Sequence, residues 1–222
     1  MKIINVAVDG PAGAGKSTIA KAVAKNLGFI YVDTGALYRT IGVYATEEKV
    51  DFEDLSTLEN LLKKTKIEIK YEDDVQKVYC NGVDFSDKIR TPEASMAASN
   101  VSKIPMVREF LLSLQRDIAK QNSCIMDGRD IGTVVLPDAK IKIFLTADVK
   151  ERAKRRFIEL REKGSNVTFE EVLDDMEKRD YQDSHREIAP LKIAEDSILV
   201  DTTSLDLEQS IEKMIKTVKD NM

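Results

Sequence analysis

An eight-residue segment near the N-terminus has the composition and spacing of a phosphate-binding loop. It matches the pattern G-x-x-x-x-G-K-[ST] and runs Gly10, Pro11, Ala12, Gly13, Ala14, Gly15, Lys16, Ser17, with Thr18 following. Glycines allow backbone N–H groups to curl around an anion, and a helix starting here adds its partial positive charge. Lys16 is suited to reach the outer phosphates, and the Ser17 hydroxyl to bind magnesium. The segment predicts a nucleoside triphosphate site.

The residues on either side of this loop predict the strand and the helix that such a site requires. Residues 3–8 are apolar and rich in β-branched side chains, which indicates a buried strand. After Ser17, apolar residues recur at helical spacing, and Gly28 is of a type that commonly ends helices. The recurring positions are Ile19, Ala20, Val23, Ala24 and Leu27. This context distinguishes the motif from a chance match in a glycine-rich turn.

Further along the chain, apolar segments alternate with helical patterns. This alternation predicts an α/β fold with a central five-stranded parallel sheet flanked by helices. The five predicted strands are residues 3–8, 29–32, 124–126, 141–145 and 198–200. Thr168 and Glu171 form a capping-box pattern that predicts a helix to Lys178, and Pro105 predicts the first turn of a helix to about Lys120.

One stretch departs from this alternation. Residues 67–71 and 77–80 alternate between apolar and polar side chains, and Asn81-Gly82 is a strong tight-turn signal. We therefore expect a small antiparallel β insert, over about residues 62–90, within a single core that spans residues 1–222.

The composition limits the classes of function. The chain has 222 residues, of which 42% are hydrophobic and 33% charged, a globular balance. Its formal charge of −5 argues against general affinity for nucleic acid, so no nucleic-acid partner is expected. No apolar run is long enough to span a membrane, so no membrane partner is expected either. Cys80 and Cys124 lack metal-type spacing and predict reduced thiols in a cytoplasmic protein.

Arginines gather near the ends of the predicted strands and helices. They fall in three clusters: residues 33–39, residues 127–130 and residues 179–186. Parallel strands present ligands at their carboxyl ends, and guanidinium groups grip phosphate with two hydrogen bonds. Each arginine could equally form a surface ion pair. Asp33 and Asp127 could bind magnesium through water or orient neighbouring arginines, and the sequence does not choose between these roles.

The basic segment 149–164 allows two interpretations. Most of its charges fit a solvated helix with pairs such as Glu151 and Arg155. The functional interpretation is a mobile lid whose arginines reach the triphosphate, with Arg152 and Arg156 the better candidates and Arg161 behind them.

The chain offers no obvious general base. Its one histidine, His185, lies among arginines and aspartates and is expected at the surface. A phosphate acceptor needs no base because it is already largely ionised near neutral pH, with a second pKa of about 6. A phosphate loop with many arginines therefore favours phosphoryl transfer to a phosphate, driven by positioning and charge stabilisation.

Over essentially its whole length, the chain resembles the bacterial cytidylate kinases, which are P-loop nucleoside monophosphate kinases. Besides the phosphate loop, which many families share, the resemblance rests on five segments. They are Asp33-Thr34-Gly35-x-x-Tyr38-Arg39, Ala98-Ser99-x-x-x-x-x-Pro105-x-Val107-Arg108, Asp127-Gly128-Arg129-Asp130-x-Gly132-Thr133, Arg179-Asp180-x-x-Asp183-x-x-Arg186 and Asp201-Thr202-Thr203. The combination of the loop with the segments at 33–39, 127–133 and 179–186 is specific.

The resemblance implies transfer of the γ-phosphoryl group of ATP to CMP or dCMP with Mg²⁺, in a protein expected to be a monomer. It implies that the insert binds the monophosphate and that residues 149–168 form the lid. Lys16, Arg129, Arg179 and Arg156 would be catalytic, with Arg156 also contacting ATP. Thr34 would contact the acceptor, whose phosphate Arg39, Arg129 and Arg179 would hold. The remaining implied contacts are Ser99, Arg108 and Asp130 with cytosine, and Asp183 and Arg186 with the sugar.

Three alternatives stay open on sequence alone. Another small-molecule kinase of this fold could act on UMP, AMP or a non-nucleotide acid. Asp130 and Arg108 distinguish this alternative from a CMP kinase, because a carboxylate accepts a hydrogen bond from the N4 amino group of cytosine but faces an acceptor in uracil. A nucleotide-dependent switch would need a guanine-reading motif such as Asn-Lys-x-Asp, which the chain lacks. RNA binding through residues 150–163 conflicts with the acidic charge.

Overall fold

A computed structural model describes residues 3–72 and 75–222 of the chain. The chain forms two compact units. The first comprises the residues up to Tyr31 together with Asn122–Met222, and the second comprises Val32–Gln121.

The predicted five-stranded parallel sheet is confirmed. Its strands lie in the order β2-β6-β1-β7-β8, in which β1 pairs in parallel with β6 and β7, and β7 with β8. The bounds are β1 Asn5–Asp9, β2 Ile30–Asp33, β6 Cys124–Gly128, β7 Ile141–Thr146 and β8 Ile198–Asp201. The register places Asp9 beside Gly128, so the segments after β1 and β6 leave the sheet at the same edge. β1 begins two residues later than the predicted strand at 3–8, and Ile3 is exposed.

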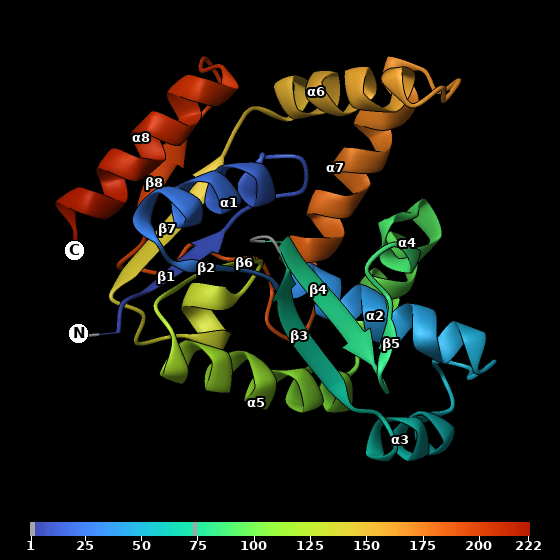
Figure 1. The fold of residues 1–222 in the computed structure, drawn as a ribbon. Coiled ribbons are helices and arrows are strands. Elements are labelled where there is room, and N and C mark those ends of the chain that lie inside the picture. The colour runs from blue at the N-terminus through green and yellow to red at the C-terminus, as the bar shows by residue number, and fades with distance from the viewer. Residues whose placement is uncertain (1–2, 73–74) are drawn as a thin grey trace. The chain divides into compact units, whose positions relative to one another are not determined.

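Helices of the first unit cover this sheet and extend beyond it. α1 and α8 pack on each other and on the strands (Figure 1), with Ile19, Val23, Met214 and Val218 in one buried cluster with the strand residue Ile143. A second, smaller cluster joins the two helices that follow β7. The bounds are α1 Lys16–Leu27, α6 Val149–Glu162, α7 Phe169–His185 and α8 Leu207–Asp220, with a π-helix at Ile131–Val135.

The helix after Thr168 is longer than the sequence pattern predicted. The capping box of Thr168 and Glu171 is confirmed, but α7 continues past Lys178 to His185. Residues 179–185 contain no glycine or proline, so nothing in the local sequence ends the helix there. As a result Arg179 and Asp183 lie one turn apart on one helix, whereas the prediction put them beyond it.

The second unit contains the predicted antiparallel sheet. Its strands have the order β3-β4-β5, and Ile69 lies opposite Val78. Asn81 and Gly82, which connect β4 to β5, have φ angles of 50° and 81°, as the tight turn requires. The bounds are α2 Thr34–Glu47, α3 Leu55–Lys63, β3 Ile67–Glu72, β4 Val75–Cys80, β5 Val83–Asp84, a 3₁₀ helix Lys88–Arg90, α4 Pro92–Val101 and α5 Pro105–Gln121.

Within the second unit, α2 and α4 pack closely because the contact is made at a glycine. A Cβ on Gly42 would lie 2.8 Å from the Ala97 Cβ and 2.9 Å from its carbonyl carbon. Cys80 here and Cys124 in the first unit are both buried free thiols. Over residues 3–72 and 75–222, none of the helices combines the length and the apolar character that crossing a membrane takes.

Candidate active site

The phosphate loop joins the end of β1 to the start of α1. A Cβ on Gly10 would lie 2.0 Å from the Leu145 carbonyl oxygen, so only glycine lets the loop leave the sheet beside β7. Gly15 caps α1 with a φ of 82°, in the left-handed region that favours glycine. The loop thus has the strand–loop–helix geometry in which backbone N–H groups surround an anion.

Lys16 lies in the first turn of α1 and is only 6% exposed. Its Nζ donates to the Pro11 carbonyl oxygen at 2.7 Å, across the loop. Burial, and after it the charge of Arg129, lowers the pKa of Lys16 to about 7. An anion bound in the loop would offset this cost, so the site favours a negatively charged ligand.

Ser17 meets a carboxylate from the neighbouring strand. Its hydroxyl donates to Oδ2 of Asp127 at 2.9 Å, while the Tyr31 hydroxyl donates to Oδ1 at the same distance. Asp127 is buried at the end of β6. A serine hydroxyl beside a fixed carboxylate supplies the hard oxygen donors that Mg²⁺ prefers, so these residues fit that ion.

The arginine that follows β6 is paired with α7. Arg129 donates from Nε to Oδ2 of Asp183 at 2.7 Å and from a terminal nitrogen to the Gly128 carbonyl oxygen. Burial alone would raise the pKa of Asp183, but the charges of Arg129, Arg179 and Arg186 outweigh it and hold that pKa below its usual value. Asp183 is therefore ion-paired with Arg129 and lies in the positive field of Arg179 and Arg186.

A second buried ion pair joins the same two segments. A terminal nitrogen of Arg186 lies 3.3 Å from Oδ1 of Asp130, and both side chains are less than a tenth exposed. The Arg186 Nε also donates to the carbonyl oxygen of Ala189. These contacts fix Asp130 in the segment where β6 turns into the π-helix.

The two arginines of α6 proposed for the lid have different surroundings. Arg152 is buried and donates to the Ala12 carbonyl oxygen of the phosphate loop at 2.8 Å, and it pairs with Asp180 of α7 at 2.6 Å. Arg156 is 41% exposed and pairs with Glu159 on its own helix. Arg152 thus ties α6 to the loop and to α7, and Arg156 is the more accessible of the two.

In the second unit, the start of α2 carries another arginine. Asp33 caps this helix by accepting the Ala36 N–H, and its other oxygen lies 2.8 Å from Arg39. The Arg39 Nε is buried and has no hydrogen-bond partner in the described part of the chain. Thr34, the first residue of the helix, is buried. Asp33 therefore orients Arg39, one of the two roles left open by the sequence.

The other predicted acceptor contacts also belong to the second unit. Arg108, in the first turn of α5, is largely buried and donates to the Ser102 carbonyl oxygen at 3.2 Å. Its guanidinium carbon lies 5.7 Å from the centre of the Tyr38 ring, within cation–π range. Ser99 lies on α4 and is half-buried. Packing thus restricts the orientation of the Arg108 side chain.

Comparison with known proteins identifies the family. The family model for cytidylate kinase matches residues 6–220. The chain belongs to the cytidylate kinase family. The cytidylate kinase of Caldicellulosiruptor bescii is 52% identical over 97% of this chain and 96% of its own length. That of Lactobacillus johnsonii is 50% identical over 98% and 94%, respectively.

A solved structure resembles this cytidylate kinase family member in fold. An uncharacterised protein from Eubacterium ventriosum superposes with a TM-score of 0.54 at 15% identity, covering 97% of this chain and 98% of its own. At that identity the likeness concerns the fold alone.

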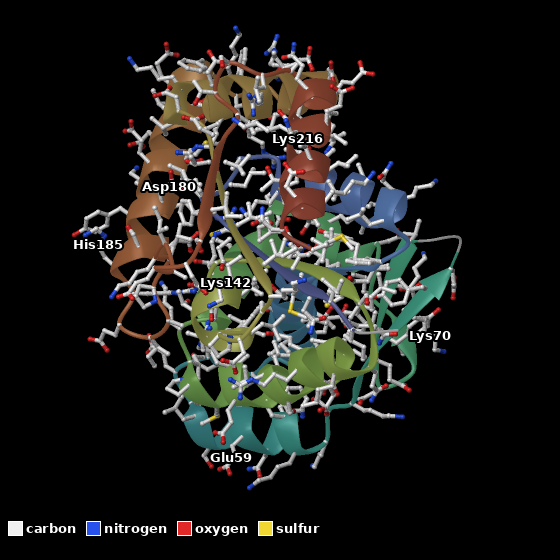
Figure 2. The ribbon with its side chains drawn as sticks, turned by 90° about the vertical axis from the view of Figure 1, so that its left-hand side faces the viewer. Glu59, Lys70, Lys142, Asp180, His185 and Lys216 are labelled. Atoms are coloured by element: carbon white, nitrogen blue, oxygen red, sulfur yellow. The ribbon has the colours of Figure 1, made fainter. Side chains whose placement is uncertain are left out.

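Sequence patterns assigned no role to Tyr31 or Asp9, and they proposed Arg152 as a lid residue without its contact to the phosphate loop. Tyr31 positions Asp127, Arg152 anchors α6 to the phosphate loop, and Asp9 binds the segment after β6. The signal for Asp9 was a charged residue at the end of an apolar run, directly before Gly10. His185 is exposed and stacks on Tyr181, and Figure 2 shows it at the outside of α7, as expected of a surface residue.

Proposed function

We propose that this protein transfers the γ-phosphoryl group of ATP to CMP or dCMP, giving ADP and CDP or dCDP. The observation that carries the proposal is that one unit holds both a phosphate loop with Lys16 and Ser17 and a cluster of arginines around Asp183. The phosphate loop and the segment of Arg129 leave the sheet at the same edge, an arrangement that suits a reaction between two phosphates. The names of the relatives agree with this chemistry.

On the donor side, the loop N–H groups and Lys16 bind the triphosphate, with contacts from residues 10–18. Ser17 and Asp127 would hold Mg²⁺, since their oxygens lie together and Asp33 is engaged with Arg39. When bound, the ion offsets charge on the phosphate oxygens. The bound triphosphate favours the protonated form of Lys16, whose charge then acts on the phosphate oxygens.

On the acceptor side, Arg129 and Arg179 hold the monophosphate, a role that the family resemblance also gives to Arg39, with Thr34 beside it. The ionised phosphate attacks without a protein base, and the arginines stabilise the charge that spreads over the transferring group. Arg156 joins from the lid at residues 149–168. The base is bound by Ser99, Arg108 and Asp130, and the sugar by Asp183 and Arg186.

The insert at 62–90 binds the monophosphate in this proposal, and the protein acts as a cytoplasmic monomer. An acceptor panel tests the function. ADP formation from ATP is measured with CMP, dCMP, UMP, AMP, GMP or no acceptor, each with Mg²⁺ or with EDTA. We expect Mg²⁺-dependent turnover with CMP and dCMP, less with UMP and almost none elsewhere. Turnover equal to the no-acceptor blank in every well would contradict the proposal.

Replacing Asp130 by alanine is expected to reduce the preference for cytosine. The ratio of kcat/KM for CMP to that for UMP should fall about tenfold, because a carboxylate matched to an amino donor is worth about 1–3 kcal/mol. The KM for ATP should change less than about threefold, because the substitution removes only a contact to the acceptor. Asp138→Ala is the control, because Asp138 is an exposed carboxylate in the same connection between β6 and β7. An unchanged ratio would remove Asp130 from base recognition.

A further inference from the structure

Asp9, the last residue of β1, makes a contact that the proposed reaction does not yet use. It is 4% exposed, and each of its carboxylate oxygens accepts one backbone N–H. Oδ1 accepts from Ile131 at 2.8 Å, and Oδ2 accepts from Gly132 at 2.7 Å. One side chain thus satisfies the first two N–H groups of the π-helix, more than 120 residues further along the chain.

The segment held in this way carries two proposed acceptor contacts. β6 ends at Gly128, and Arg129 and Asp130 are the only residues between it and the π-helix. Asp130 has an irregular backbone, with φ −144° and ψ 26°. The strand fixes one end of this short connection and Asp9 fixes the other, so the directions of both side chains depend on the Asp9 contact.

The packing around Gly132 makes the contact tight. A Cβ on Gly132 would lie 3.3 Å from Oδ2 of Asp9 and 3.2 Å from Cδ of Lys142. Lys142, labelled in Figure 2, is itself largely buried, and its Nζ lies 2.8 Å from Asp196. An alanine at position 132 would therefore require the Asp9 carboxylate or the Lys142 side chain to shift by a few tenths of an ångström.

Filling the core does not account for an aspartate at this position. Burial, partly offset by the two N–H groups, raises the pKa of Asp9 to about 6, which reports the cost of keeping a carboxylate there. An apolar side chain would avoid that cost but would leave two buried N–H groups without acceptors. An aspartate therefore suits this position, because its two carboxylate oxygens accept the two N–H groups of the segment.

We infer that Asp9 is a positioning residue that couples the phosphate loop to the acceptor side of the first unit. Its backbone leads directly into Gly10, while its side chain sets the segment of Arg129 and Asp130. The phosphate loop and the segment of Arg129 and Asp130 are thus both attached to Asp9. The inference rests on the proposed function, because it assigns the acceptor to those two residues.

The test is Asp9→Asn, which keeps the size of the side chain but turns an NH₂ group toward one of the two N–H groups. We expect the KM for CMP to rise about tenfold and kcat to fall by a similar factor, since small misplacements of reacting groups cost up to about a hundredfold. The ratio of CMP to UMP use should fall as well. The Kd for ATP, measured by calorimetry without acceptor, should change less than about twofold.

Ser210→Ala is the matched control. Ser210 is a buried residue of α8 whose hydroxyl donates to the Asp206 carbonyl oxygen, and it belongs neither to the phosphate loop nor to the segment of Arg129 and Asp130. It should lower Tm without changing the KM for CMP. If Asp9→Asn lowers Tm but leaves KM, kcat and the CMP/UMP ratio at wild-type values, Asp9 is merely structural and the inference is wrong. An equal loss of affinity for ATP would also overturn it.

Two further measurements keep the inference testable if that variant does not fold or if the protein acts on another acceptor. Gly132→Ala crowds the same contact from the other side and should raise the KM for CMP in the same way; wild-type kinetics would count against the inference. Amide exchange at Ile131 and Gly132 needs no substrate, and faster exchange in Asp9→Asn is expected. Unchanged exchange would overturn the inference, whereas a wild-type protein inactive with CMP would overturn only the proposed function.

Discussion

Replacing Lys16 by methionine is expected to lower kcat by about 10²- to 10³-fold, the loss typical of removing one preorganised group that stabilises transition-state charge. The same change should leave the ligand-free protein at least as stable as wild type at pH 7. Burial disfavours the ammonium form of Lys16, and this cost lowers its pKa to about 7 in the folded state, against 10.5 ordinarily. Methionine fills similar space without that charge.

The pH dependence of stability gives an independent check on Lys16. Between pH 7 and 10.5 the unfolded chain binds the lysine proton more tightly than the folded protein, so this residue makes the wild type more stable as pH rises through that window. The advantage of Lys16→Met in Tm should therefore be largest near pH 7 and shrink toward pH 10. ATP should reduce the advantage, since the anion offsets the cost in the wild type.

Lys21→Met is the control for this prediction, because Lys21 is an exposed lysine on the same helix. It should change neither kcat nor Tm appreciably. Near-normal turnover by Lys16→Met would remove the phosphate-loop assignment. A variant that is inactive and also clearly less stable at pH 7 would show that the lysine contributes to the fold instead of straining it.

Replacing Gly10 by alanine is expected to destabilise the protein by about 3 kcal/mol or more, the upper range for overpacking. The added Cβ would lie 2.0 Å from the Leu145 carbonyl oxygen and 3.0 Å from its carbonyl carbon. Leu145 belongs to β7, which is paired with strands on both sides, so its backbone cannot move away cheaply. Urea unfolding followed by circular dichroism measures the loss.

Gly28→Ala separates crowding from backbone conformation. Gly28 has a φ of 68°, but a Cβ there would meet nothing within 4 Å. Alanine at this position should cost only about 1–2 kcal/mol, the penalty for a left-handed residue. If Gly10→Ala proves no more destabilising than Gly28→Ala, the close approach of the loop to β7 is not a constraint on the fold.

Much of the fold followed from local patterns in the sequence. The parallel sheet could be predicted because its strands are apolar runs separated by helical repeats, and the antiparallel sheet because its strands alternate and end in Asn81-Gly82. The full length of α7, by contrast, could not be predicted from local patterns. The charged series after Lys178 has the composition of a surface loop, yet contacts such as that of Asp183 with Arg129 support it as helix.

The phosphate loop and the family were determined by the sequence alone, because backbone conformation and anion binding there depend on residue types at fixed short spacing. Tertiary structure decided which groups share a hydrogen bond across long separations. It placed Asp127 with Ser17, Arg152 with Ala12 and Asp9 with Gly132. These contacts arise where neighbouring strands and the segments after them meet, and one chain's local sequence carries no record of which distant segment will lie beside it.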